Sequence, residues 1–402
     1  MSAIGNVPFA SQNAFGRTTN ASVTSTSSNG VAGTNKLWLP IWSGEVMTAF
    51  DQYRVFGSTT ESRTIASGRV AEVPIMGTVA LKSAWGAGEE LVGNTNDHVS
   101  KTIAVQLDAR PIATHFELDN IDLMISQWEY RSELARQAGQ TLANARDLQV
   151  GSYLVRSAAE GLVVDDPRLK VPSTGWRNSL APSPLYADVA FAHLGEGTDA
   201  QRSDAALLLL SKLEDFMIHL QEIDADTSGV FCAVSPRIFH DIRALGVARE
   251  SADLVGGSGR PFFGGVADAG GLGAGLKDGM AGLQDRLEYM GVSIMKTNHM
   301  PTFDATGANV IGEARYNGLF AAAGVKAVIW QPAAVAQLNS TGLKVDTVDD
   351  IRRNTTFTVA SMMGGTGVLR PECASVVTSV AHASKAALMT ALGFTAEFVN
   401  TA

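Results

Sequence analysis

The stretch SQWEYRSELARQAGQTLANARDLQVGSYLVRSAAE, residues 126–160, is the longest uninterrupted helical pattern in the chain. It contains no proline, and an apolar residue recurs at every third or fourth position while charged residues fill the other faces. This spacing predicts a single amphipathic helix. At about 1.5 Å per residue the helix would be roughly 50 Å long. We therefore expect it to span the subunit, with the other elements laid across it.

Two glycines, Gly139 and Gly151, interrupt this helical pattern. A glycine inside a helix costs about 1 kcal/mol relative to alanine, so each needs a physical reason. Three interpretations remain open. The glycines could allow close packing against another element, the helix could end early at Gly151, or a glycine could mark a functional bend.

The composition is that of an ordinary globular protein. The chain has 402 residues, 45% hydrophobic and 18% charged, which is enough for two or three domains. It contains neither a run of eighteen apolar residues nor a signal-peptide pattern, so we expect no membrane span and intracellular synthesis. The formal charge of -9, without clustered Lys or Arg, argues against a nucleic-acid-binding protein.

The two cysteines, Cys232 and Cys373, both lie among apolar or small residues. This setting favours buried free thiols over a disulfide bond between them.

The N-terminal region, residues 1–35, is dominated by Ser, Thr, Asn and Gly and has almost no charge or apolar periodicity. We expect a flexible arm there. Composition leaves open whether the arm is a tail without a role or a segment that orders against a neighbour. A short amphipathic helix is predicted at 45–56.

An extended hairpin is predicted next. Residues 69–76 and 99–107 alternate apolar and polar side chains, as strands do, and the connection between them is rich in Gly and Asn. The tip carries Glu89, Glu90 and Asp97. These acids would either pair with arginines of another subunit or remain solvated.

The remainder of the chain indicates a mixed α/β region. Ser203 is the expected N-cap of a second long helix, and Ser235 the cap of a third that begins at Pro236. The predicted elements are a loop-rich connector at 163–197, helices at 203–223 and 236–245, a Gly-rich loop at 256–282, strands at 230–234, 290–296, 325–330, 343–348 and 355–362, a turn and last strand in LRPECASVV, and a small-residue tail at 381–402.

No stretch of the sequence has the residue spacing that a known catalytic, cofactor-binding or metal-binding motif requires. Gly271, Gly273 and Gly275 form G-x-G-x-G rather than the dinucleotide fingerprint. The loop that begins at Asp224 has Ser235 where a calcium loop needs Glu, so we expect a capped turn. The seven histidines lack ligand spacing, and the charged group at 346–353 is typical of a solvated surface. We therefore expect no catalytic, cofactor or metal site, and a protein that acts through its surfaces.

A collinear series of short stretches connects the chain to a known family. The series consists of GEVMTAF at 44–50, IASGR at 65–69, VPIMG at 73–77, GEEL at 88–91, YRSE at 130–133, Ser-Pro at 235–236, MGV at 290–292 and LRPE at 369–372. Together these stretches, which fall between about residues 36 and 378, resemble the major capsid protein of T-seven-like short-tailed phages, the podovirus group.

The resemblance implies the α+β fold of Hong-Kong-97-type phage capsid proteins. Its parts would be an N-terminal arm at 1–55, an E-loop at 56–112, a P-domain with the spine helix at 113–199, an A-domain at 200–340, and a return to the P-domain with a C-terminal tail at 341–402. The Gly-rich region and the tail after residue 380 depart from the family pattern.

The resemblance also implies a function without catalysis. The chain would be made in the host cytoplasm and form the pentamers and hexamers of an icosahedral virion capsid. That capsid would enclose double-stranded DNA without sequence-specific binding. A scaffolding protein, a portal and a possible decoration protein would be its other partners, and no membrane would be involved.

A contact between subunits follows as a hypothesis. Glu89 and Glu90 at the E-loop tip would dock against Arg131 or Arg136 on a neighbouring spine helix, because the tip is acidic and the helix face is basic. Two alternatives remain for the whole chain. One is an encapsulin-like shell of a cellular compartment, and the other is a soluble α/β enzyme that uses the Gly-rich loop.

Overall fold

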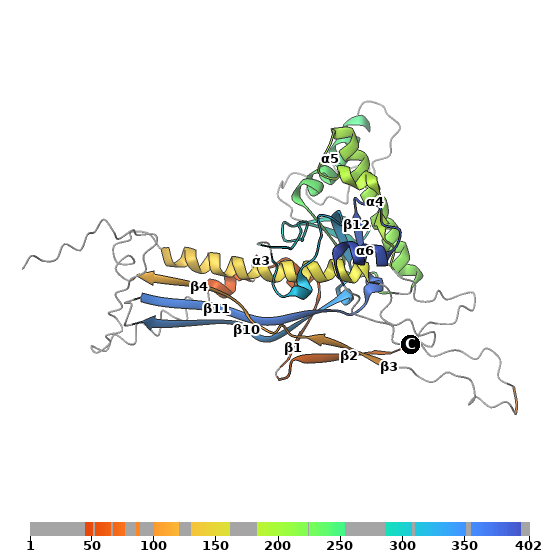
Figure 1. The fold of residues 1–402 in the computed structure, drawn as a ribbon. Helices are drawn as coiled ribbons and strands as arrows, with labels where there is room; N and C mark the ends of the chain where they lie inside the picture. Colours follow the sequence, from red (N-terminus) through yellow and green to blue (C-terminus); the bar gives the residue numbers. More distant parts are fainter. Residues whose placement is uncertain are drawn as a thin grey trace, which may run out of the picture.

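The computed structural model describes residues 45–50, 53–65, 67–76, 86–88, 100–119, 130–160, 183–223, 225–253, 286–307, 310–350 and 355–394. Helices and strands are mixed throughout these residues, which agrees with the expected α+β class. Figure 1 shows a long layer of strands along the helix α3, with a second domain rising from one end of that helix. We call this second part, built on a six-stranded sheet, the six-stranded domain.

The long predicted helix is α3, Tyr130–Ala159. Its expected first residues, 126–129, lie outside the described residues. A Cβ on Gly139 would lie 2.6 Å from the carbonyl oxygen of Val46, and one on Gly151 would lie 2.8 Å from Cδ of Pro301. Close packing therefore explains both glycines. The early end at Gly151 is wrong, because the helix continues for two more turns.

One side of α3 covers a four-stranded sheet in the order β1–β10–β11–β4 (Figure 1). Leu142 of α3 shares a buried apolar cluster with Ala360 and Met362 of β11. The strands predicted at 343–348 and 355–362 are parts of two longer antiparallel strands. The bounds are β1, Glu61–Thr64; β4, Ile112–Asp119; β10, Val335–Asp350; and β11, Thr355–Val368.

The predicted hairpin consists of β2, Val70–Met76, and β3, Ser100–Gln106, which pair antiparallel. Its tip, with Glu89, Glu90 and Asp97, lies outside the described residues. The helix predicted at 45–56 ends earlier than expected: residues 45–50 and residue 53 are helical, residues 54–55 are not, and the 3-10 turn η3, Phe56–Ser58, follows.

The six-stranded sheet has the order β5–β12–β9–β6–β8–β7. The strands predicted at 230–234 and 325–330 have the expected bounds, but the strand predicted at 290–296 begins two residues later, because Met290 and Gly291 form a turn. The strands of this six-stranded sheet are β5, Tyr186–Ala187; β6, Val230–Val234; β7, Arg286–Tyr289; β8, Val292–Lys296; β9, Val325–Trp330; and β12, Ala374–Thr378.

Two helices, α4, Asp199–Glu222, and α5, Pro236–Asp253, belong to this domain. The predicted N-cap Ser203 is wrong. Thr198 caps α4 instead, and Gln201 completes a reciprocal capping box with it, so the helix begins a turn earlier. α5 begins at Pro236 as expected but extends past residue 245.

The connector predicted at 163–197 is more regular than expected in its described part, 183–197. It contains β5 and the 3-10 helix η4, Val189–His193. The preceding residues, 163–182, lie outside the described residues.

The C-terminal region contains a helix that the sequence interpretation missed. Residues 381–402 include α6, Lys385–Leu392, which Ser384 caps and which ends at Gly393 with φ of 77°. Lys385 Nζ donates to the carbonyl oxygen of Glu160 at 3.1 Å and to Ser183 Oγ at 2.6 Å. Burial lowers the pKa of Lys385 to about 8. α6 is therefore docked against the C-terminal end of α3.

Two other predicted segments, the arm at 1–35 and the Gly-rich loop at 256–282, lie outside the described residues. Within the described parts of the chain, no helix has the length and apolar character that crossing a membrane requires.

Candidate assembly site at the base of the hairpin

The hairpin crosses β11 where that strand is rich in glycine. A Cβ on Gly365 would lie 2.2 Å from the carbonyl oxygen of Gln106, and one on Gly367 would lie 2.6 Å from Cγ1 of Val105. Real side chains do not tolerate such distances, so only glycine lets the two backbones approach this closely. The amide of Asp108 donates to the carbonyl oxygen of Gly364 at 3.0 Å and fixes the crossing point.

A buried carboxylate, Asp108, lies just beyond the crossing, where β3 has ended, and is 2% exposed. It accepts hydrogen bonds from the Tyr316 hydroxyl at 2.7 Å and from the Arg315 guanidinium. Arg315 also donates to the carbonyl oxygen of Gln106 at 3.2 and 3.3 Å. Burial raises the pKa of Tyr316, which keeps its hydroxyl protonated as a donor.

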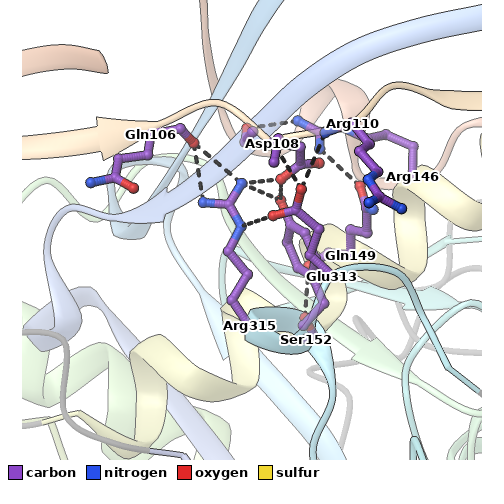
Figure 2. A network of polar contacts seen from close by, with 11 residues as sticks. Gln106, Asp108, Arg110, Arg146, Gln149, Ser152, Glu313 and Arg315 are labelled. Atoms are coloured by element: carbon purple, nitrogen blue, oxygen red, sulfur yellow. Dashed lines mark hydrogen bonds and ion pairs between the residues drawn. The ribbon is translucent and has the colours of Figure 1, made fainter. Parts of the chain in front are cut away.

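A second acid, Glu313, holds the next two residues. Its side chain accepts from the amides of Ala109 and Arg110. Figure 2 shows Glu313, which immediately precedes the 3-10 turn η5, Ala314–Tyr316, side by side with Arg315 of that turn, and both reach toward the end of β3. Four of the five residues at the base of the hairpin, Gln106, Asp108, Ala109 and Arg110, are thus held through their backbone atoms or the Asp108 side chain.

The helix α3 contributes Arg146, which is fully buried. Arg146 donates to the carbonyl oxygen of Gly365 at 2.7 Å and to Gln149 Oε1 at 3.1 Å, and no carboxylate of the described residues pairs with it. A buried guanidinium without a carboxylate is costly, so its geometry here must be closely specified. Its role is to attach the crossing point on β11 to the spine helix.

The chain that leads into β1 is attached to the same helix one residue further on. Asp147, fully buried, accepts from the amides of Val55 at 2.7 Å and Phe56 at 3.2 Å, and its Oδ2 lies 3.0 Å from His299 Nδ1. Trp330 Nε1 donates to the carbonyl oxygen of Thr59 at 2.9 Å. α3 therefore holds the segment that precedes β1 and, through Arg146, the part of β11 that the hairpin crosses.

Of the four predicted contact residues, the structure describes only the side chain of Arg136. Glu89 and Glu90 lie outside the described residues, and the side chain of Arg131 is also outside them. Arg136 is exposed on α3, where it pairs with Glu133 at 2.6 Å and donates to the Tyr53 hydroxyl at 2.7 Å. The hydrogen bond from Arg136 lowers the pKa of Glu133 to about 2.

The other chemical predictions concern single groups. Cys232 and Cys373 are buried free thiols, as expected, and burial raises the pKa of each to about 12. Asp226 accepts from the amide of Ser228 at 2.9 Å, which agrees with the expected capped turn. Asp346 pairs with Lys344 at 2.8 Å on the surface. Among the described residues, no group of three or more His, Cys, Asp or Glu is arranged for a metal ion.

Sequence comparison gives one short stretch of similarity. No protein-family model matches the chain. Over 114 residues, 28% of this chain, it is 35% identical to the major capsid protein of Escherichia phage T7, and that stretch spans 32% of the relative. The minor capsid protein of the same phage is also 35% identical over 114 residues, which span 27% of its length. The similarity covers about a third of each curated relative or less.

Structural comparison covers most of the chain. The capsid structure of the cyanophage P-SCSP1u matches 82% of this chain and 89% of its own, with a TM-score of 0.57 and 21% identity. The mature capsid of bacteriophage PhiM1 matches 81% of this chain and 86% of its own, with a TM-score of 0.52 and 15% identity. The chain therefore has the Hong-Kong-97-type fold of phage capsid proteins, as its sequence resemblance implied.

Proposed function

We propose that this chain is the major capsid protein of a tailed phage, and that its copies form the pentamers and hexamers of an icosahedral head. The observation that carries the proposal is the match of its fold to the cyanophage capsid over 82% of the chain. The curated T7 relatives support the same role over a shorter stretch. The role is structural rather than enzymatic.

The hairpin base explains how such a subunit holds its neighbours. A projecting hairpin can bear load between subunits only if its root does not rotate. Asp108, Glu313 and Arg315 fix that root, and Arg146 connects it to α3. Force on the hairpin is then transmitted to the spine helix instead of being lost in a flexible joint.

The partner of the hairpin tip is the spine helix of an adjacent copy. In this arrangement Glu89 and Glu90 approach Arg131 or Arg136 of the neighbour. Arg136 keeps 44% of its side chain exposed despite its ion pair with Glu133, so its guanidinium can also donate hydrogen bonds to a carboxylate of another subunit. Exchange of one partner for another at an exposed pair involves a small free-energy change, about 0–1 kcal/mol, which suits reversible assembly.

The proposed domains follow the capsid arrangement: arm at 1–55, E-loop at 56–112, P-domain at 113–199, A-domain at 200–340, and P-domain return and tail at 341–402. A scaffolding protein, a portal and a possible decoration protein complete the shell, which forms after synthesis in the host cytoplasm. The net charge of -9 supports a shell that encloses DNA without binding it tightly.

The test is the mass of the purified chain by light scattering, with negative-stain microscopy of the large fraction. Closed shells, or rings of five and six, are expected. A monomer or dimer that persists when the scaffolding protein is added would contradict the proposal. An encapsulin-like compartment would also form shells, but the curated relatives are phage proteins, so that alternative has less support.

A further inference from the structure

The C-terminal helix α6 is attached at both of its ends. Figure 1 shows it beside the end of α3, at the base of the six-stranded domain. Leu388 in the helix is fully buried. Just after the helix, the Phe394 ring packs edge-on against Phe320, with 6.0 Å between the ring centroids, and the guanidinium of Arg156 in α3 lies 5.4 Å from the centroid of the same ring. Residues 384–394, which we call the C-terminal clasp, therefore connect α3 to the loop before β9.

The first turn of the clasp is attached through a buried amine. Lys385 Nζ donates to the carbonyl oxygen of Glu160, at the end of α3, at 3.1 Å and to Ser183 Oγ at 2.6 Å. Ser183 is 3% exposed and donates in turn to the carbonyl oxygen of Pro371 at 3.1 Å, in the 3-10 turn η7, Pro371–Cys373. Both acceptors of Lys385 are neutral oxygens, and among the described residues no carboxylate forms an ion pair with it. A buried ammonium without an ion pair is unfavourable, so this site holds an uncharged amine more easily.

The charges around Lys385 do not compensate for its burial. Burial lowers the pKa of Lys385 from 10.5 to about 8, although the nearby charges of Glu372 and Glu160 act in the opposite direction. His219 of α4 faces the same amine, and burial lowers the pKa of its imidazole, with a smaller contribution from the charge of Lys385. When the clasp opens, Lys385 enters water and regains the pKa of an exposed lysine. The open clasp therefore binds more protons than the closed clasp between about pH 8 and 10.5.

The other ionisable groups beside this site behave differently. Burial raises the pKa of the Glu372 carboxyl group, so its ionisation as the pH rises opposes the effect of Lys385. His219 stays neutral above about pH 7, since its pKa lies below 6.5, and Cys373 stays protonated below about pH 9, since burial raises its pKa to about 12. Between about pH 7 and pH 9, Lys385 is therefore the group whose proton favours opening. The remaining charged groups that face these residues are Arg370 and Glu222.

We propose that the C-terminal clasp is proton-linked: it holds the end of α3 to Ser183 and to the loop that carries Phe320, and it opens more readily when Lys385 carries its proton. The closed clasp loses stability as the pH falls from 10.5 to about 8. Below about 8 the loss is complete, because the amine is then protonated in both states. The inference goes beyond the capsid function and concerns the folded subunit alone, so its failure and the failure of that function are separate results.

The first test is hydrogen exchange of the α6 amides in the full-length wild-type chain. After correction for the intrinsic exchange rate, α6 should open on the order of tenfold more readily at about pH 7 than at about pH 9. The amides of α6 should also exchange faster than those of β9, because the clasp opens without unfolding of the sheet. Equal opening of α6 at the two pH values, or equal exchange in α6 and β9, would overturn the proposal.

The variant Lys385→Met assigns the proton. Methionine keeps much of the length and the apolar contacts of the lysine side chain but cannot be protonated, so the pH dependence of α6 opening should disappear. Lys326→Met is the matched control, since the ammonium of Lys326 pairs with Glu196 at 3.6 Å instead of binding the end of α3, and it should keep the wild-type pH dependence. An unchanged pH dependence in Lys385→Met would overturn the proposal. If this variant does not fold, the wild-type measurement still decides.

Two further variants separate protonation from packing. Phe394→Ala removes the apolar contact with Phe320 and should increase opening at least about tenfold at both pH values, with an unchanged ratio between them. Glu372→Gln removes the group of opposite sign and should make the pH dependence steeper. Loss of the pH dependence in Glu372→Gln would assign the proton to Glu372 and reject the role of Lys385.

Discussion

The six-stranded domain and the base of the hairpin are held together by different kinds of interaction. The domain is built on a large apolar core in which Leu209, Leu213 and Phe216 of α4 are fully buried. The hairpin base has only a small apolar cluster, in which Val105 and Leu107 pack with Leu338, and it depends in addition on a few polar atoms and on glycines that allow close approach. An apolar core gives stability roughly in proportion to its buried area, whereas a polar network fixes orientation. The apolar core of the six-stranded domain should therefore control whether the subunit folds, and the polar network should control the direction of the hairpin.

The largest expected effect is in the apolar core. Leu213→Ala should destabilise the six-stranded domain by about 2–5 kcal/mol, because it removes a fully buried side chain and leaves a cavity. Hydrogen exchange should quicken in α4 and its sheet while the amides of β2 and β3 keep their wild-type rates. Equal acceleration in both regions would show that they unfold as one unit and would remove the distinction drawn above.

The next effect is steric and tests the crossing point. Gly365→Ala places a Cβ 2.2 Å from the carbonyl oxygen of Gln106, so the hairpin or β11 must move. We expect a loss of about 1–3 kcal/mol, typical of overpacking, and failure to form closed shells. Differential scanning calorimetry would measure the loss of stability, and electron microscopy would show whether closed shells form.

The matched control for this variant is Gly342→Ala in β10, where a new Cβ meets no atom of the described residues within 4 Å. Its stability should change by less than about 0.5 kcal/mol, and its shells should look normal. If both variants assemble alike, the glycine crossing does not set the direction of the hairpin.

The elements of the fold were largely predictable because local patterns determine them. The period of α3 and the alternation of β2 and β3 are visible in short windows of sequence. α6 was missed although its signals are present: Ser384 caps it, Gly393 ends it, and Ala, Leu and Met between them favour a helix. The error came from interpreting small residues as a tail.

The hairpin base was not predictable in the same way. Asp108 and Arg315 are 207 positions apart, so no local pattern connects them. One signal was available: three glycines at 364, 365 and 367 occur in a stretch that otherwise alternates as a strand, which marks a close approach of another backbone. That signal gives the crossing point but not the element that crosses there. The proposed contact of Glu89 and Glu90 with a neighbouring helix stays a prediction.

An effect of similar size on stability, but confined to the hairpin base, is expected from Asp108→Asn. The substitution keeps the size of the side chain but weakens its hydrogen bonds from Arg315 and Tyr316, worth about 1–3 kcal/mol in a buried, charged network. Exchange of the amides at the base of β2 and β3 should quicken while α4 stays protected. Asp346→Asn is the control, because its pair with Lys344 is exposed and should contribute less than about 1 kcal/mol. Identical amide exchange rates in Asp108→Asn and Asp346→Asn would mean that Asp108 does not hold the base of the hairpin.

The smallest expected effect concerns where α4 begins in the six-stranded domain. Thr198→Ala removes the hydroxyl that accepts from the Gln201 amide and donates to Gln201 Oε1, and should cost about 1 kcal/mol. Ser203→Ala should cost little, because Ser203 lies inside the helix and its hydroxyl donates only to the carbonyl oxygen of Ala200 at 2.8 Å. Thermal melts of the two variants should differ in that order. The reverse order would place the helix start at Ser203.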